Sequence, residues 1–313
     1  MAWLTGYKYR KQITIAGTVD GVKTNYTMKL TVYRSAGVDA PNVVYLGVGK
    51  CETDYDDLRF TTSDGATLLD YWIESSDAAS AVVWIEFDSI PASPSTGTFF
   101  IYYGNAGAAA VSNGANTFPF FDDFSGTLTD KWSPNYSSNA GGICTVGDGV
   151  NAGALTGLTT FDQGYAYRTY AKCVATGSYN FLVEAACASG YARLGQYSAI
   201  HGSNFACQSD RIGSNVGDTG VAWNTNWYIS EVQRFSASLL KVFFNGGQVL
   251  STTTVNNIPT GAGALQFQNS AGKQTQVDWA LVRKITTTEP TWSTWGAEEN
   301  FILGGLSMSG CGR

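Results

Sequence analysis

Short runs in which apolar and polar residues alternate follow one another along most of the chain. In the clearest run, residues 24–33, the side chains of Tyr26, Met28, Leu30 and Val32 would share one face of a strand. A period of two is typical of a strand with one buried face. No amphipathic helix of normal length is evident in either half. The pattern therefore predicts an all-β protein.

Turn-forming residues separate the predicted strands. Ser63-Asp-Gly65 would join a strand at 58–60 to one at 68–73, and Asn245-Gly246 is the favoured sequence of a two-residue hairpin. The 36 glycines suit many tight turns of this kind. Further strands are expected at about 165–174, 179–188, 191–200 and 204–212.

A stretch of small, uncharged residues interrupts the pattern between Gly104 and Phe118. Such a stretch between two strand-rich blocks is typical of a domain boundary. We expect a first β-sandwich domain at 1–104, a linker at 105–118, a second domain at 119–296 and a C-terminal tail at 297–313. A linker of this composition would offer few contacts, so each domain should fold alone.

Charge and hydropathy exclude several classes of partner. The formal net charge is −6, and no cluster of Lys and Arg is present, so a nucleic acid or an anionic membrane is not an expected partner. No run of about 18 apolar residues could span a bilayer. The N-terminus lacks the apolar core of a signal peptide. Either a leader was removed or the protein leaves a cytoplasm by another route, such as release inside a virus particle.

The cysteines are too widely spaced for a zinc site. No CxxC pair occurs, and the sequence contains one histidine, His201. Buried, reduced thiols are the favoured interpretation. A disulfide among Cys173, Cys187 and Cys207 is the alternative. The six cysteines are Cys51, Cys144, Cys173, Cys187, Cys207 and Cys311.

Motifs in the first half resemble the DUF2341 family, a β-rich domain found in surface, secreted and viral proteins. The resemblance covers about residues 3–105 and implies no established activity. Its motifs are Tyr9-Arg-Lys-Gln-Ile-Thr-Ile15, Asp57-Leu-Arg-Phe60 with Asp64-Gly65, Tyr71-Trp-Ile-Glu74, Trp84-Ile85 and Ile101-Tyr-Tyr-Gly-Asn105.

The second half, about 119–296, resembles the concanavalin A-like lectin/glucanase superfamily. The resemblance implies a jelly roll of two packed antiparallel sheets. The expected fold class is thus two β-sandwich domains, the second a concanavalin A-like jelly roll. The motifs are Phe121-Asp-Asp-Phe-Ser125, Trp227 at the head of a long strand, Phe243-Phe-Asn-Gly246 and Val277-Asp-Trp-Ala-Leu-Val-Arg283.

No catalytic constellation is evident. Glucanases of that superfamily carry a Glu-x-Asp-x-(x)-Glu run on one strand, which places paired carboxylates on one face. Glu184 has no acidic residue at i+2 or i+4, and Asp122 and Asp123 would point to opposite faces. A Ser-His-Asp triad would depend on His201, which an ordinary surface histidine explains better. We therefore expect no enzymatic activity.

Outward-facing aromatic and charged residues form the candidate ligand site. Exposed tyrosine and tryptophan faces are typical of sugar binding. If the strands of this region pair in sequence order, five side chains would share one face; a solvated sheet face with incidental tyrosines is the alternative. The candidates are Arg168, Tyr170, Glu184, Arg193 and Tyr197.

A structural calcium ion is a further possibility. Glu52, Asp54 and Asp57 crowd one loop with Asp56, and oxygen ligands in a loop suit this cation. The EF-hand spacing is absent, and a solvated acidic turn is the favoured interpretation.

Together these features predict a non-enzymatic structural protein of a virion or cell surface, of the tail-fibre, spike or capsid-decoration type. Its jelly roll would bind a glycan or host surface. The alternatives are a secreted or cell-wall adhesin with a carbohydrate-binding module, and a polysaccharide hydrolase. Other assembly subunits and copies of itself are expected partners, with the apolar tail contributing contacts. The tail residues concerned are Phe301, Ile302, Leu303, Leu306 and Met308.

Overall fold

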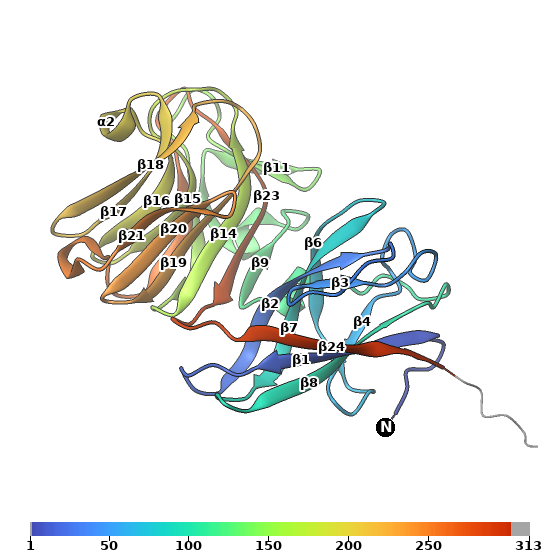
Figure 1. The fold of residues 1–313 in the computed structure, drawn as a ribbon. Coiled ribbons are helices and arrows are strands. Elements are labelled where there is room, and N and C mark those ends of the chain that lie inside the picture. Colours follow the sequence, from blue (N-terminus) through green and yellow to red (C-terminus); the bar gives the residue numbers. More distant parts are fainter. Residues whose placement is uncertain (1, 302–313) are drawn as a thin grey trace, which may run out of the picture. The chain divides into compact units, whose positions relative to one another are not determined.

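The computed structural model describes residues 2–301, except for the side chains of Ile200 and His201. Strands account for most of this range, and the predicted all-β class is confirmed (Figure 1). The chain divides into two compact units. Unit 1 combines residues up to 117 with the chain from 288 onward, and unit 2 is the continuous segment 118–287. Among the described helices, none is long and apolar enough to cross a membrane.

Unit 2 is a sandwich of two antiparallel sheets. The strand order does not follow the sequence, because the chain crosses repeatedly from one sheet to the other. The seven-stranded sheet runs β10 (Trp132–Asn135), β13 (Ala154–Phe161), β22 (Gly263–Gln268), β15 (Asn180–Cys187), β16 (Gly190–Gln196), β17 (Asn204–Asp210), β18 (Ser214–Ala222). The eight-stranded sheet runs β11 (Ser137–Ala140), β12 (Ile143–Val146), β23 (Thr275–Lys284), β14 (Tyr165–Cys173), β19 (Tyr228–Ser236), β20 (Leu239–Phe244), β21 (Gly247–Thr252), with β9 (Phe120–Asp122) also paired to β23.

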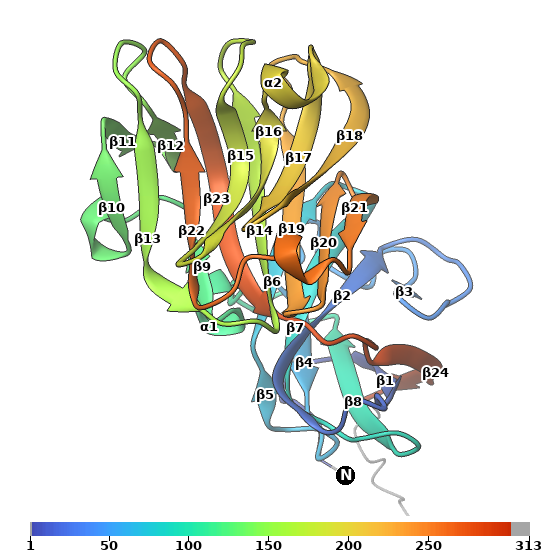
Figure 2. The same ribbon diagram turned by 90° about the vertical axis from the view of Figure 1, so that its left-hand side faces the viewer.

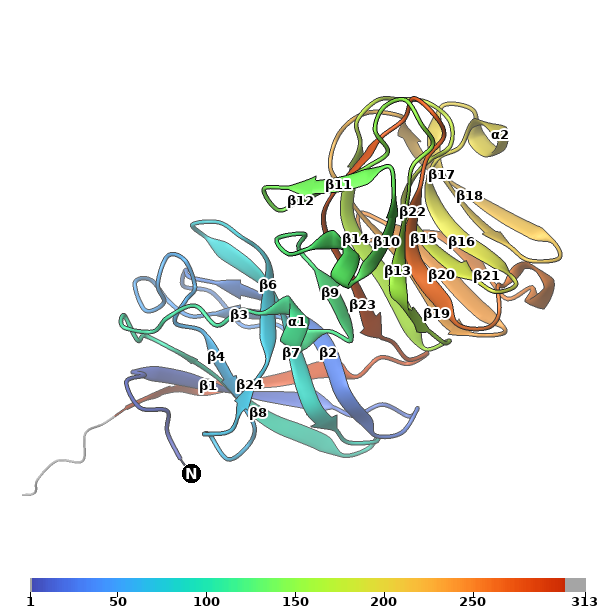
Figure 3. The same ribbon diagram turned by 180° about the vertical axis from the view of Figure 1, so that it is seen from behind.

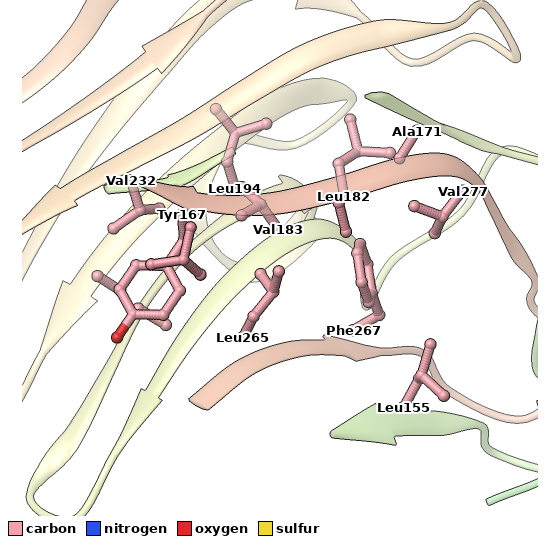
Figure 4. Packing of buried hydrophobic residues seen from close by; sticks show 14 of the residues in the cluster. Leu155, Tyr167, Ala171, Leu182, Val183, Leu194, Val232, Leu265, Phe267 and Val277 are labelled. Carbon is pink, nitrogen blue, oxygen red and sulfur yellow. The ribbon is translucent and has the colours of Figure 1, made fainter. Parts of the chain in front are cut away.

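Alternation along the strands builds the core of this sandwich. Tyr167 and Ala171 of β14 point inward, as do Leu265 and Phe267 of β22, and all four are buried (Figure 4). Burying one large apolar side chain contributes roughly 1.5–3 kcal/mol to folding. The jelly-roll sandwich expected for this segment is therefore present. Short helices lie in its connections: η1 (Leu128–Asp130), α2 (Ser198–His201) and η2 (Val255–Asn257).

Unit 1 is a smaller sandwich. Its core includes Ile13, Leu30, Val83 and Ile101, and among these Leu30 lies on the face that alternation predicts to be buried. One sheet runs β24 (Thr291–Asn300), β1 (Tyr9–Ala16), β8 (Thr96–Tyr103), β4 (Arg59–Thr61), β5 (Leu68–Leu69). The other runs β3 (Val43–Tyr45), β2 (Lys23–Tyr33), β7 (Ser80–Ile90), β6 (Tyr71–Ser76).

The last strand corrects the expected C-terminal boundary. β24 pairs antiparallel with β1, from Tyr9 opposite Asn300 to Ala16 opposite Thr291 (Figure 3). Trp292 is buried in the unit 1 core and its Nε1 donates a hydrogen bond to Lys29 O over 3.0 Å. The second domain therefore ends before residue 288, not at 296, and the tail expected from 297 begins inside a strand. A pairing between opposite ends of the chain leaves no local signal in the sequence.

The segment expected to be a free linker is also packed. Asn113 N donates to Tyr71 O over 2.9 Å, and Ile73 N donates to Ser112 Oγ over 2.9 Å. Arg59 Nη2 donates to Ala109 O over 2.7 Å. The short helix α1 (Gly114–Thr117) follows. Small side chains let this backbone approach unit 1, so the segment belongs to that unit.

The five described cysteines are free thiols, and four of them are buried as the favoured interpretation expects, whereas Cys187 is half-buried. Cys144 is buried, and burial raises the pKa of its thiol to about 12, with the negative charge of Asp122 adding to the rise. Cys311 and the tail residues Ile302, Leu303, Leu306 and Met308 lie outside the described residues.

Candidate functional site

The five predicted ligand-site residues do not share one face. Strand β14 pairs with β19 and β23, and not with β15 as expected. Arg168 and Tyr170 therefore lie in the eight-stranded sheet, whereas Glu184 and Arg193 lie in the seven-stranded sheet with Tyr197 at its end. The expected pairing of β14 with β15 is wrong because the chain changes sheet between these two strands, whereas β15 and β16 do pair in sequence order.

Arg168 belongs to a buried ion cluster. Its Nη1 lies 2.9 Å from Glu231 Oε2 on the neighbouring strand, and Arg283 Nη2 lies 2.9 Å from Glu231 Oε1. Burial opposes ionisation of Glu231, but the guanidinium groups of Arg283 and Arg168 outweigh it and lower the pKa of this carboxyl to about 2. The cluster links three strands through charges that are already paired.

Tyr170 is likewise engaged by its neighbours. Its ring stacks on Trp227 and Trp279, with centroids 5.1 and 5.9 Å away. Arg168 and Tyr170 are thus packed within the eight-stranded sheet, apart from the three other predicted residues, which lie together on the seven-stranded sheet.

A β-bulge shapes the outer face of the seven-stranded sheet. The register between β15 and β16 shifts between Phe181 and Val183, so Leu182 and Val183 both enter the core. Phe181 and Glu184 are thereby turned to the same outer face. Gly195 permits this geometry, because a Cβ there would lie 2.3 Å from Asn180 O. Figure 2 shows β15, β16, β17 and β18 side by side in this sheet.

One row of polar side chains crosses five strands of that face. The register places Glu184 opposite both Gln266 and Arg193. Gln266 Nε2 donates to Thr156 Oγ1 over 2.6 Å, and Arg193 Nη2 donates to Gln208 Oε1 over 3.0 Å. We call this set the polar row: Thr156, Gln266, Glu184, Arg193 and Gln208. Gln268, beside the row on β22, donates to Gln266 Oε1 over 3.0 Å.

Aromatic rings surround the centre of the polar row. The guanidinium carbon of Arg193 lies 3.8 Å from the ring centroid of Tyr191 and 4.3 Å from that of Phe181. The rings of Tyr197 and Tyr179 follow at 5.0 and 5.4 Å. At these distances each ring attracts the cation. The three tyrosines are half-buried, and we call them the tyrosine cluster: Tyr179, Tyr191 and Tyr197.

Glu184 lies beneath this surface. Only 3% of the residue is exposed, and its Oε2 has no hydrogen-bond partner. Arg193 Nη1 is 3.8 Å away, beyond hydrogen-bond distance. Burial raises the pKa of Glu184 to about 7, while Arg193 opposes the rise. Glu184 is thus a proton-exchanging group near neutral pH whose chief contact is the buried arginine.

A second carboxylate is not placed beside Glu184. The face carries Asp210 on β17, opposite Tyr191 of β16. Two strand spacings separate β15 from β17, which is about 10 Å. Retaining glycosidases need two carboxyl groups about 5 Å apart, and inverting ones need room for a water between them. The described part of the face does not present the close pair.

The residues of this surface that the sequence-based candidate set does not contain are Thr156, Tyr179, Phe181, Tyr191, Gln208, Gln266 and Gln268. Gln266 and Gln268 flank the inward Phe267, so period-two alternation could have placed both on an outer face. Nothing local indicated that β22 lies next to β15. Phe181 has the parity of an inward residue, and only the bulge turns it outward.

The predicted calcium ligands are not gathered. Asp57 is fully buried and accepts hydrogen bonds from Cys51 Sγ, Glu52 N and Gly104 N over 3.1, 3.0 and 2.7 Å. Asp54 Oδ1 instead accepts from Asp56 N over 3.2 Å, and Glu52 is exposed. Among the side chains that the structure describes, no group of three or more that could ligate an ion is placed to hold one. Asp57 organises the loop through backbone amides instead.

Comparison with known proteins gives one family and a set of similar folds. Residues 54–135 match the family model "Domain of unknown function (DUF2341)", which agrees with the expected resemblance over 54–105 and leaves 3–53 unmatched. Comparison with the curated proteins gives no match.

Similar solved structures cover about half of the chain. An uncharacterised protein from Mycobacterium paratuberculosis is 11% identical over 53% of this chain and 100% of its own, with a TM-score of 0.44. A β-1,3-1,4-glucanase (lichenase) from a mouse hindgut metagenome is 9% identical over 53% of this chain and 99% of its own, with a TM-score of 0.43. A Bacillus licheniformis β-glucanase is 11% identical over 53% of this chain and 97% of its own, with a TM-score of 0.41. In sequence, the chain is similar to DUF2341 over residues 54–135.

Proposed function

We propose that this protein is a non-enzymatic surface protein and that unit 2 binds a glycan on the outer face of its seven-stranded sheet. The observation that carries the proposal is the polar row, bordered by the half-buried tyrosine cluster. Sugar hydroxyls both donate and accept hydrogen bonds, and side-chain amides do the same. Tyrosine rings add an apolar face for the C–H side of a sugar ring and a polar tip for its edge.

The length of the row supports an oligosaccharide over a single sugar. Its ends lie on β13 and β17, four strand spacings apart, or about 19 Å. The amide side chains are fixed by hydrogen bonds to one another and to Thr156, so their ordering costs little on binding.

We place the protein on the exterior of a virion, as a tail-fibre, spike or decoration subunit. Residues 54–135 match DUF2341. The resemblance to this family implies a domain of surface, secreted or viral proteins, which supports an external location. Repeated copies would raise the avidity of a weak single site. An adhesin of a cell surface would use the same face. Immunogold labelling of particles and of cells with an antibody against unit 2 separates these two locations.

Substitution of two residues of the tyrosine cluster tests whether this face binds the glycan. Tyr191→Ala with Tyr197→Ala should weaken binding of the best oligosaccharide on a glycan array by at least about tenfold, or 1.4 kcal/mol. Isothermal titration with that oligosaccharide gives the affinities. Tyr136→Ala, an exposed tyrosine of unit 2 outside this face, is the matched control. Equal affinities for all three proteins, or no binding to any arrayed glycan, would contradict the proposal.

A polysaccharide hydrolase is the second candidate, favoured by one observation: Glu184 has a pKa of about 7, which suits a general acid. The missing second carboxylate argues against it. We expect no new reducing ends from β-glucans or agar. Turnover that disappears in Glu184→Gln would overturn the non-enzymatic proposal.

A further inference from the structure

We infer that this face accepts uncharged glycans and rejects sulfated or carboxylated ones, and that Asp210 and Asp218 determine this selection. The inference rests on the proposed function and adds the chemical class of its ligand.

Positive charge is nearly absent from the seven-stranded sheet. Its strands contain one basic residue, Arg193, and three acidic residues, Glu184, Asp210 and Asp218. All four charges belong to the outer face. Cys207 points into the core, so Gln208 and Asp210 point outward, and Asp218 is opposite the outward Ala206. The strands of this face therefore supply a net negative charge, which does not attract an anion.

The single cation is already engaged. Arg193 is 4% exposed, its Nη2 donates to Gln208, and its Nη1 faces Glu184. The four surrounding rings cover the guanidinium plane. Recognition of a sulfate or carboxylate by arginine needs an accessible guanidinium fork. An acidic sugar would have to displace Gln208 and the tyrosine cluster to reach it.

The two remaining carboxylates are accessible and held in place. Asp210 is half-buried, and its Oδ2 accepts from Gln208 Nε2 over 3.2 Å. Asp218 is exposed, and its Oδ1 accepts from Gly220 N over 2.8 Å. Asp210 thereby places a negative charge beside the Gln208 end of the polar row. A like charge on a ligand is repelled there, whereas a neutral hydroxyl can still donate to a carboxylate.

The test is a glycan array with matched pairs: each neutral oligosaccharide beside the same backbone carrying 6-O-sulfate or a C6 carboxylate. The measured quantity is the ratio of neutral to acidic affinity. For the unmodified protein we expect a ratio of at least about ten at low salt. The ratio should fall in 0.5 M NaCl, because salt screens exposed charges.

Variants assign the ratio to particular residues. Asp210→Asn with Asp218→Asn should lower it at least about fivefold, and each single substitution should lower it in part. Asp130→Asn, an exposed acid of unit 2 outside the sheet, should leave it unchanged. Thermal melts establish that each variant is folded. Acidic glycans that bind as tightly as their neutral partners, or a ratio unaltered in both single variants, would overturn the inference. Absence of binding to every glycan would instead contradict the proposed function on which it rests.

Discussion

Glu184 and Glu231 are buried carboxyl groups of unit 2 in opposite electrostatic surroundings. Glu231 lies between two guanidinium groups at 2.9 Å, whereas Glu184 faces one guanidinium at 3.8 Å that aromatic rings also hold. Burial raises the pKa of Glu184 to about 7, and the two arginines lower that of Glu231 to about 2 despite its burial. Substitution of these residues should therefore have different consequences.

Glu184 should make stability fall as the pH rises. An unfolded glutamate titrates near 4.5, so between that pH and about 7 the folded protein binds more protons than the unfolded chain. The contribution is present below the unfolded pKa and is lost through the folded one, in total roughly 3 kcal/mol. Glu184→Gln should flatten this dependence. Urea unfolding at pH 5 and pH 7.5 measures it, and equal slopes for the two proteins would refute the assignment.

Glu231→Gln should be strongly destabilising at neutral pH. The substitution leaves Arg168 and Arg283 without their shared carboxylate, and breaking a buried pair costs about 3–5 kcal/mol. The lowered pKa means that the stabilisation exists above the unfolded value and is lost as the pH falls toward about 2. Thermal unfolding at pH 7 gives the loss. Glu184→Gln is the matched control. It should lower the free energy of unfolding by less, because burial disfavours the ionised form of Glu184 and a neutral amide replaces it without leaving a strongly bound charge unpaired.

At the scale of single elements, local pairings could be predicted and distant ones could not. Strands β15 and β16 are joined by a two-residue turn at Ala188 and Ser189, so Glu184 opposite Arg193 follows from sequence order. Gln266 opposite Glu184 requires that β22 insert between β13 and β15, and alternation alone does not choose a strand's neighbours. The fold class could be predicted because many strands show their own period of two. The site could be predicted only in part, because Gln266 and Thr156 belong to strands that are remote in the sequence.

Strand β24 lies partly in the segment expected to be a C-terminal tail, so the sequence gives no indication that unit 1 needs it. Trp292 is buried in unit 1 and Trp295 is half-buried beside it, with stacked rings 6.1 Å apart. Trp292→Ala should destabilise unit 1 by about 3–5 kcal/mol, the range for a large aromatic removed from a core. Trp295→Ala should cost clearly less. Hydrogen exchange resolves the two units, and the faster exchange should appear in β1, β8 and β24 but not in unit 2. Equal protection of unit 1 in both variants would contradict the buried role of Trp292.

At the scale of the whole molecule, unit 2 is a continuous segment placed within the sequence of unit 1. The two ends of unit 2 are neighbours, since Phe120 of β9 lies opposite Val282 of β23. Unit 1 depends on both ends of the chain, because β24 completes the sheet that β1 begins. The expected linker, residues 105–118, is therefore not a point at which the chain separates into two complete domains.

Expression of fragments tests this arrangement. Residues 118–287 should melt cooperatively alone, because their core is complete. Residues 1–117 alone should not, since they lack Trp292 and the ion pair of Arg10 with Glu299 at 2.7 Å. Joining 1–117 to 288–301 through a flexible Gly/Ser linker should restore a cooperative transition, because it returns β24 to the edge of β1. The same fusion with Trp292→Ala is the control and should melt lower. A cooperative melt of 1–117 by itself would show that β24 is dispensable, and the boundary drawn here at residue 288 would then be incorrect.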